Sequence, residues 1–291
     1  MLSVPLRAVQ RRRWSTPERG VLPWLLSLPL LVILLVIYLF PIIDAVGTAL
    51  KANGTSLTDL SIVPAHPMWS NFGYVLQQTS LPIYFRNSAA ITGVSVLLVV
   101  GCGSLAGFGF SRLRFPGRTL LYVMFLCGLM VPVVVIVVPL FQMVRFFGLF
   151  NTYGALIGPY TALGLPFSVM VFRTFFDGIA AELEDAARID GCSNWRIFRS
   201  VMLPLSIPAL ISVAVLQAVT SWNEFLLALL FMTRDEMRTV PLAIIPFIGQ
   251  FGNQTEYMFA TLLLISVPPL LLFVLLQRYF QIGLTTGAVK G

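Results

Sequence analysis

The feature that most constrains the fold of this chain is a set of long apolar stretches with almost no charges. A helix crosses the roughly 30 Å hydrocarbon core of a bilayer with about 20 mostly apolar residues. Six stretches reach that length, and only Glu224 interrupts the fifth: residues 21–43, 87–111, 119–144, 146–172, 200–233 and 257–277. Charged residues make up only 11% of the chain, against about 25% in soluble proteins. The sequence therefore predicts an all-α integral membrane protein with six transmembrane helices.

The distribution of lysine and arginine predicts the orientation, because cytoplasmic loops carry an excess of these residues. With a cytoplasmic N-terminus, all but five of the 19 Lys and Arg residues fall in cytoplasmic segments; the five are Lys51, Arg86, Arg145, Arg234 and Arg238. Both termini are therefore expected in the cytoplasm. The net charge of +7 is spread between the apolar stretches and does not form one basic face, so nucleic acid is not expected as a partner.

We expect one membrane domain, residues 21–291, after a basic cytoplasmic segment, residues 1–20. The first apolar stretch exceeds the roughly 7–15 residues of a signal-peptide core, and no small-residue cleavage site follows it, so a retained signal anchor is expected. The outer loop at about 48–86 is expected to form a small lid or a short exposed helix. Gly103 and Gly107 have the spacing of a helix-packing face in the second span.

One segment, 174–203, differs from the rest because it concentrates acidic residues and has helical periodicity. Its apolar positions predict one face of a short helix, and they are Ile179, Leu183, Ala186 and Ala187. Glu184 and Arg188 form a favourable i,i+4 pair on the opposite face. Asp177 is a candidate N-cap, and Gly191 after Asp190 is a candidate helix stop. Trp195, Phe198 and Met202 predict a second short helix. Periodicity alone is equally compatible with an ordinary surface loop.

The residues of this segment also carry a family resemblance. The string ELEDAARIDG at 182–191, followed by WRIF at 195–198 and LPLSIP at 203–208, resembles the EAA loop of bacterial ABC importer permeases of the carbohydrate-uptake branch. Asp185 stands where that loop usually has Glu, and Cys192 where it usually has Ala. FSRLRFPGR at 110–118, WNEFL at 222–226 and GLTTGAVKG at 283–291 are also similar to segments of that family. The resemblance runs from about residue 85 to the end, with its core at about 85–280.

The resemblance implies that the 174–203 loop forms a cytoplasmic coupling helix between the fourth and fifth spans. The ATPase-coupling residues would be Glu184, Asp185, Ala186, Ala187, Asp190 and Gly191. It also implies four kinds of partner in a bacterial cell membrane: a second related permease, two ATPase subunits, an extracytoplasmic sugar-binding protein and membrane lipid. The implied cargo is a di- or oligosaccharide of maltose or trehalose type, or a glycerol-phosphate derivative.

No ATP site of the P-loop type is expected in this chain, because that motif needs Gly directly before Lys. Lys51 follows Leu50 and Lys290 follows Val289. ATP and Mg are therefore expected on the partner ATPase. His66 is the single histidine, so no catalytic residues, cofactor or metal site are expected. A secondary transporter or channel without an ATPase is the alternative, followed by a non-transporting scaffold.

Glu224 is the strongest single-residue signal within the apolar stretches, because an ionisable group inside a membrane usually has a partner or a water-filled path. A structural hydrogen bond, a position near the outer interface and a direct sugar contact all remain open. The candidate substrate-path residues are Gln217, Ser221, Trp222, Asn223 and Glu224. Consecutive helical residues point about 100° apart. At most two of residues 222–224 are therefore expected to line the path.

Overall fold

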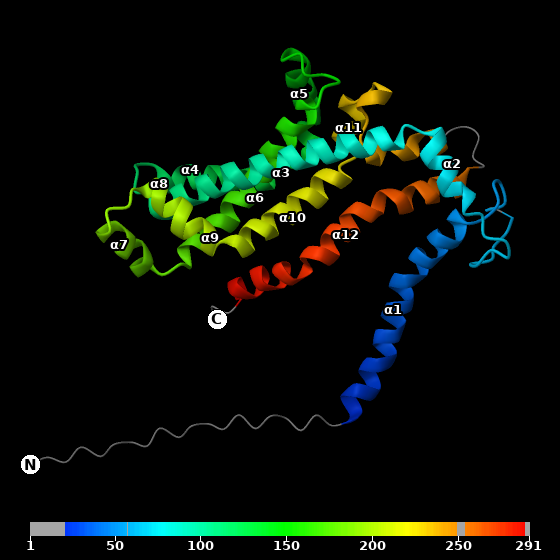
Figure 1. Cartoon of the computed structure of the whole chain (residues 1–291), viewed down its shortest axis with the longest axis horizontal. Coiled ribbons are helices and arrows are strands. Elements are labelled where there is room, and N and C mark those ends of the chain that lie inside the picture. The colour runs from blue at the N-terminus through cyan, green and yellow to red at the C-terminus, as the bar shows by residue number, and fades with distance from the viewer. Residues whose placement is uncertain (1–20, 57, 249–253, 289–291) are drawn as a thin grey trace, which may run out of the picture. The chain divides into compact units, whose positions relative to one another are not determined.

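The computed structural model describes residues 21–56, 58–248 and 254–288, and within them every regular element is helical (Figure 1). The chain divides after Ala45 into two compact units, each described here by itself. The first contains most of α1 (Val21–Ala49), a continuous helix despite two internal prolines. Its apolar side chains are largely exposed from Leu28 onward. This is the surface expected of a helix surrounded by lipid or by other membrane helices.

Four long helices run side by side in the second unit: α3 (Leu81–Arg112), α6 (Gly154–Asp177), α10 (Ile207–Asn223) and α12 (Thr255–Ala288) (Figure 1). α3 packs against both α6 and α10, and α10 packs against α12. Together with α1, the helices α3, α6 and α12 are each long and apolar enough to cross a membrane. The fourth predicted span begins at Gly154 rather than at residue 146, because the chain turns between α5 (Val133–Phe146) and α6.

The contact between α3 and α6 depends on two glycines of α3. A Cβ atom built on Gly103 would overlap the hydroxyl of Ser168, and one on Gly107 would lie 2.6 Å from the Cβ of Phe172. A real Cβ atom could not come this close to either neighbour, so only glycine at these two positions lets α6 pack at this distance from α3. The prediction that Gly103 and Gly107 form a helix-packing face is confirmed.

The third predicted span is a broken helix. α4 (Arg118–Cys127) continues into η1 (Gly128–Met130), and α5 follows at a bend of 102°. Pro132 lies at this bend. Proline has no amide hydrogen and pushes the preceding residue towards an extended backbone, and Val131 has a ψ of 110°.

The fifth predicted span is broken as well, at both ends of α10. α8 (Asn194–Ile197), η2 (Phe198–Met202) and α9 (Leu203–Leu205) precede it and meet it at a bend of 76°. Ser206 at this bend is fully buried, and its hydroxyl donates to the carbonyl of Met202 at 2.6 Å. The described residues thus contain four helices long and apolar enough to cross a membrane unbroken, or up to six such spans if each bent pair counts as one.

The second break in that stretch is at Glu224, whose extended backbone ends α10. The chain continues through α11 (Leu226–Phe231), η3 (Asp235–Met237) and η4 (Val240–Phe247). Two side chains of α3 bind this segment. Asn87 Nδ2 donates to the carbonyls of Glu236 and Arg238 at 2.8 and 2.9 Å, and the amide of Val240 donates to Ser88 Oγ at 2.9 Å. This end of the bundle, called the α11 end below, is therefore held by specific polar contacts.

Asp235 adds an ionised contact at the α11 end. The hydroxyls of Ser80 and Tyr84 both donate to its carboxylate. These hydrogen bonds, with a smaller contribution from nearby Arg238, hold the pKa of Asp235 below its ordinary value. The carboxylate therefore stays charged and bonded to α3 at neutral pH.

The outer loop predicted at about 48–86 contains one short helix, α2 (Ser70–Gln78), before α3 begins. Asn71 on α2 is buried, and its amide donates to the carbonyls of Ala49 and Lys51 at 2.8 and 2.9 Å. The amide of Ser56 donates to Glu256 at the start of α12, at 2.8 Å. The loop is thus a tethered element with a short helix, one of the two predicted forms.

Candidate functional site

The first region with predicted functional residues is the two-helix loop at the end of the bundle opposite α11 (Figure 1). Its first helix, α7 (Ala181–Ile189), begins with acidic residues and has Arg188 in its last turn, which suits the helix dipole. Gly191 follows with a φ of 76°, the left-handed conformation that glycine tolerates best. The predicted helix stop at Gly191 is confirmed.

The predicted N-cap is wrong, because Asp177 is the last residue of α6 and Ala180 precedes α7. Asp177 Oδ1 instead accepts a hydrogen bond from Ser111 Oγ of α3 at 2.6 Å. Asp177 also forms an ion pair with Arg173, at 3.6 Å. It therefore ties α6 to α3 and does not start α7.

The residues of α7 that face the bundle are not the same set as its predicted apolar face. Glu184 and Ala187 face the bundle and are buried, whereas Leu183 and Ala186 are exposed. The predicted pair of Glu184 and Arg188 is present, at 2.7 Å. Glu184 faces the bundle because Arg112, the last residue of α3, lies there and forms an ion pair with it. The periodicity of the loop cannot reveal a partner that comes from another helix.

The outward face of α7 carries the remaining predicted coupling residues. Asp185, Ala186 and Asp190 are exposed, and so is Gly191 in the turn that follows. Large apolar side chains lie among them: Leu183 is 48% exposed, and Ile189 is 86% exposed. A short helix with exposed carboxylates and exposed large aliphatic groups is suited to bind another protein.

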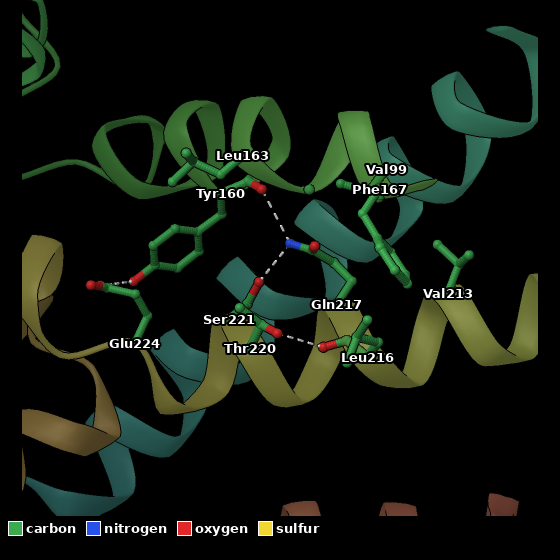
Figure 2. Close-up of a pocket in the computed structure, with 11 residues that line it drawn as sticks. Val99, Tyr160, Leu163, Phe167, Val213, Leu216, Gln217, Thr220, Ser221 and Glu224 are labelled. Atoms are coloured by element: carbon green, nitrogen blue, oxygen red, sulfur yellow. Dashed lines mark hydrogen bonds between the residues drawn. The ribbon is translucent and has the colours of Figure 1, made fainter. Parts of the chain in front are cut away.

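The second region is a cavity of about 160 Å³ between α6 and α10 (Figure 2). Its polar lining comes from three of the five predicted path residues, Gln217, Ser221 and Glu224, together with Tyr160 and Thr220. Val99 of α3 and Phe167 of α6 contribute apolar lining. Ligand pockets usually have about 300–1,000 Å³, so this cavity is smaller than an ordinary ligand pocket.

Glu224 has two roles in the structure at once. Its carboxylate accepts hydrogen bonds from the amides of Leu227 and Ala228, at 2.8 and 3.1 Å, and so caps α11. It also accepts a hydrogen bond from the Tyr160 hydroxyl on α6, at 2.7 Å (Figure 2). Glu224 therefore makes structural hydrogen bonds and also lines the cavity.

Gln217 and Ser221 lie one turn apart on α10 and face α6. Gln217 Nε2 donates to the backbone carbonyl of Tyr160 at 3.2 Å and to Ser221 Oγ at 2.9 Å (Figure 2). Gly164 of α6 makes room for this approach, because a Cβ atom there would overlap the amide group of Gln217.

Trp222 and Asn223 are not among the residues that line this cavity. Trp222 points towards α12, where its Nε1 donates to the carbonyl of Ile265 at 3.1 Å. The residue four positions after Ile265 is Pro269, which has no amide hydrogen to offer that carbonyl. Trp222 thus supplies the donor that α12 lacks. Asn223 is exposed.

Sequence reasoning missed Tyr160 and Gly164. Both lie inside a long apolar stretch, where Tyr and Gly alone are ordinary residues. The available signal was the polar pair Tyr160-Thr161 after Pro159, in the middle of a membrane span. Only the packing of α6 against α10 shows that Tyr160 meets Glu224.

Several apolar helices around a partly polar cavity, with an exposed two-helix loop at one end, define a helical membrane permease. The chain belongs to the family described as binding-protein-dependent transport system inner membrane component, whose model matches residues 99–285.

Two curated relatives are carbohydrate permeases. The chain is 36% identical to the arabinooligosaccharides transport system permease protein AraQ of Halalkalibacterium halodurans, covering 93% of this chain and 98% of the relative. It is 35% identical to the trehalose/maltose transport system permease protein MalG of Thermococcus litoralis, covering 89% and 94%. The chain is thus a multi-pass ABC transporter permease of the carbohydrate-uptake type.

A solved structure shows the same fold. It is a bacterial ABC transporter involved in the import of the acidic polysaccharide alginate, and it superposes with a TM-score of 0.79 at 20% identity. The match covers 90% of this chain and 98% of the other. The helical bundle with its broken helices is therefore an ABC permease fold.

Proposed function

We propose that this chain forms half of the translocation path of an ATP-driven sugar importer in a bacterial cell membrane, and that a separate ATPase drives it through α7. The observation that carries the proposal is the two-sided character of α7. Glu184 and Ala187 fix one side to the bundle, while Asp185, Ile189 and Leu183 are exposed on the other. A helix held firmly behind and exposed in front can transmit a rigid-body displacement.

The proposed energy source is ATP hydrolysis by a partner subunit, because this sequence has no P-loop motif. Neither lysine of the chain lies in a P-loop, so ATP and Mg would bind to the partner ATPase, and this chain would act as a transport subunit without catalytic residues. The charge distribution supports a cytoplasmic position for α7 and for both termini. The ATPase and α7 would then meet on the same side of the membrane.

The size of the cavity supports a second permease subunit. About 160 Å³ cannot hold a disaccharide, so another chain would supply the opposite wall. Because one chain has one α7 loop, a pair of permeases would present two loops to two ATPase subunits. The family description names a binding protein, and such a protein, on the extracytoplasmic side, would deliver the sugar at the α11 end, which lies opposite the α7 loop.

The cargo supported best is a di- or oligosaccharide of maltose, trehalose or arabino-oligosaccharide type, with a glycerol-phosphate derivative as the further class. Gln217, Ser221 and Thr220 offer donors and acceptors for hydroxyl groups, and Phe167 offers an aromatic face. These are the groups that a hydroxylated, partly apolar ring requires.

Reconstitution tests this function directly. The chain, copurified with its partners, is placed in proteoliposomes, and binding-protein-stimulated ATP hydrolysis and uptake are measured over a sugar panel. We expect uptake that requires ATP, and native mass spectrometry showing one copy of this chain beside a different permease and two ATPase subunits. Uptake without any ATPase would favour a secondary transporter or channel, and a functional homodimer of this chain would contradict the heteromeric arrangement.

Glu224 offers a test of the transport path. Glu224→Gln keeps the size of the side chain and one acceptor oxygen, so either the Leu227 amide or the pair formed by the Ala228 amide and the Tyr160 hydroxyl keeps its acceptor, and we expect assembled complex and substantial uptake. Glu224→Ala removes the cap, and loss of a helix cap costs about 0.5–2 kcal/mol. With the Tyr160 contact also lost, we expect uptake to fall about tenfold or more, a free-energy change of about 1.4 kcal/mol. Uptake is measured per assembled complex.

Tyr160→Phe separates the two contacts of Glu224. It removes the hydroxyl but leaves the α11 cap intact, so we expect uptake between that of the wild type and that of Glu224→Ala.

Equal loss of assembled complex in Glu224→Gln and Glu224→Ala would indicate an ion-dependent structural role. Unchanged uptake in both would show that the cavity is not part of the path.

A further inference from the structure

Arg112, the last residue of α3, bridges three elements at the α7 end of the bundle. Its side chain is only 14% exposed. Nη2 donates to the carbonyl of Phe176 in the last turn of α6 and to the carbonyl of Ile179 in the link to α7, both at 2.7 Å. Sequence reasoning treated this arginine only as a topology signal, which its contacts correct.

The third element that Arg112 reaches is α7 itself. Its Nε lies 3.4 Å from Oε2 of Glu184, an ion pair without the geometry of a hydrogen bond. The Glu184 side chain is 10% exposed, and its other oxygen accepts from Arg188 at 2.7 Å. Without Arg112, Glu184 would be paired only with Arg188 of α7 itself, and the ion pair between α7 and α3 would be lost. The bridge therefore holds α7 in one position.

The covalent links of α7 cannot provide that rigidity. Gly178 precedes α7 and Gly191 follows it, and glycine leaves the backbone freest to rotate. The Arg112 bridge instead connects α7 to α3, a helix distant in sequence. α3 is in turn fitted tightly to α6 at Gly107. A displacement of α7 can reach this helix pair through Arg112 even if the glycine links bend.

We propose that Arg112 is a positioning residue of the transport cycle: through Glu184 it makes α7 move together with α3 and α6, so that each ATP-driven displacement of α7 reaches the transport path. This rests on the proposed function of α7. The exposed face of α7 would determine ATPase binding, whereas the Arg112–Glu184 bridge would determine how much of the resulting motion is used.

The test measures sugar transported per ATP hydrolysed, using the reconstituted full complex. We expect Arg112→Gln to assemble and to hydrolyse ATP, while the ratio falls about fivefold or more, the lower end of ordinary coupling between sites. Glu184→Gln should show a similar loss. The double variant should lose less than the two single losses combined, because both remove the same bridge. Arg112→Lys keeps the charge without the planar fork, so it should lie between the wild type and Arg112→Gln.

Arg114→Gln is the matched control, because Arg114 is an exposed arginine two positions further along. Its ratio should stay at the wild-type value. An unchanged ratio in Arg112→Gln, an equal loss in Arg114→Gln, or additive losses in the double variant would overturn the proposal. Loss of assembled complex in both Arg112 variants would show a purely structural role and overturn it as well. Wild-type uptake without an ATPase would instead refute the proposed function, and this proposal with it.

Discussion

Asp185→Lys is expected to lower sugar uptake and binding-protein-stimulated ATP hydrolysis together, by about tenfold or more, with normal membrane insertion. Asp185 is exposed on the outward face of α7, and within the described residues its side chain makes no hydrogen bond or ion pair that its loss would break. A reversed charge would meet the ATPase surface with repulsion, and like-charge juxtaposition at an interface costs several kcal/mol. Copurified ATPase, uptake and hydrolysis are the measurements.

Asp185→Glu is the control for this charge reversal. It keeps the charge and adds one methylene group, so uptake should remain near the wild-type value. Normal uptake by Asp185→Lys, with normal ATPase content, would show that α7 does not contact the ATPase through this residue.

Gly191 provides a second test of the same loop by a different physical route. A Cβ atom at this position would meet nothing within 4 Å, so the only penalty is the φ of 76°. Such backbone strain costs about 1–3 kcal/mol for a residue that avoids this conformation. Gly191→Val should therefore displace the end of α7 and reduce coupled uptake, whereas Gly191→Asn should retain it, since Asn tolerates the left-handed region. Equal behaviour of the two variants would remove the conformational explanation.

Gly107→Val is expected to have the largest effect on the fold. A Cβ atom at this position would lie 2.6 Å from the Cβ of Phe172 and 3.0 Å from the backbone nitrogen of Arg173. Neither atom is the movable end of a side chain, and overpacking a tight interface costs about 1–3 kcal/mol or more. We expect the yield of folded, detergent-stable chain to fall about tenfold, a free-energy change of about 1.4 kcal/mol. Size-exclusion chromatography of the detergent extract measures it.

Gly101→Val is the matched control on the same helix. Gly101 is exposed, and a Cβ atom there would meet nothing within 4 Å. Both variants carry the same intrinsic cost of valine in a helix, so a difference in yield reports the α3–α6 contact alone. Equal yields would mean that α3 and α6 can separate at Gly107 without loss.

The sequence predicted the spans better than their continuity. Apolar length is a local property, so the helices α1, α3, α6 and α12 appear where the stretches indicated. Pro132 was visible, but whether a proline kinks a membrane helix mildly or bends it by 102° depends on what its neighbours offer the freed carbonyls. Glu224 illustrates the same limit, because its neighbours in the sequence do not show that it meets Tyr160 of α6.

The conformation and contacts of the candidate site residues could be predicted where they depend only on nearby residues in the sequence. Gly191 needs only its own φ, and Glu184 with Arg188 needs only helix spacing. Arg112 and Tyr160 were missed because their partners come from elements far away in the chain. Arg112 of α3 pairs with Glu184 and so helps to set which side of α7 faces the bundle, which the sequence of the loop alone cannot show.

The breaks at the two ends of α10 would let this helix tilt as a rigid unit. It is a rod of 17 residues with a joint at Ser206 and another at Glu224. At 1.5 Å per residue its length is about 25 Å. If one joint stays fixed, a tilt of about 10° moves the other by about 4 Å, more than the length of a hydrogen bond. Gln217 and Ser221 lie near the Glu224 joint, so a small rotation beside the α7 loop would be magnified into the making or breaking of polar contacts in the cavity.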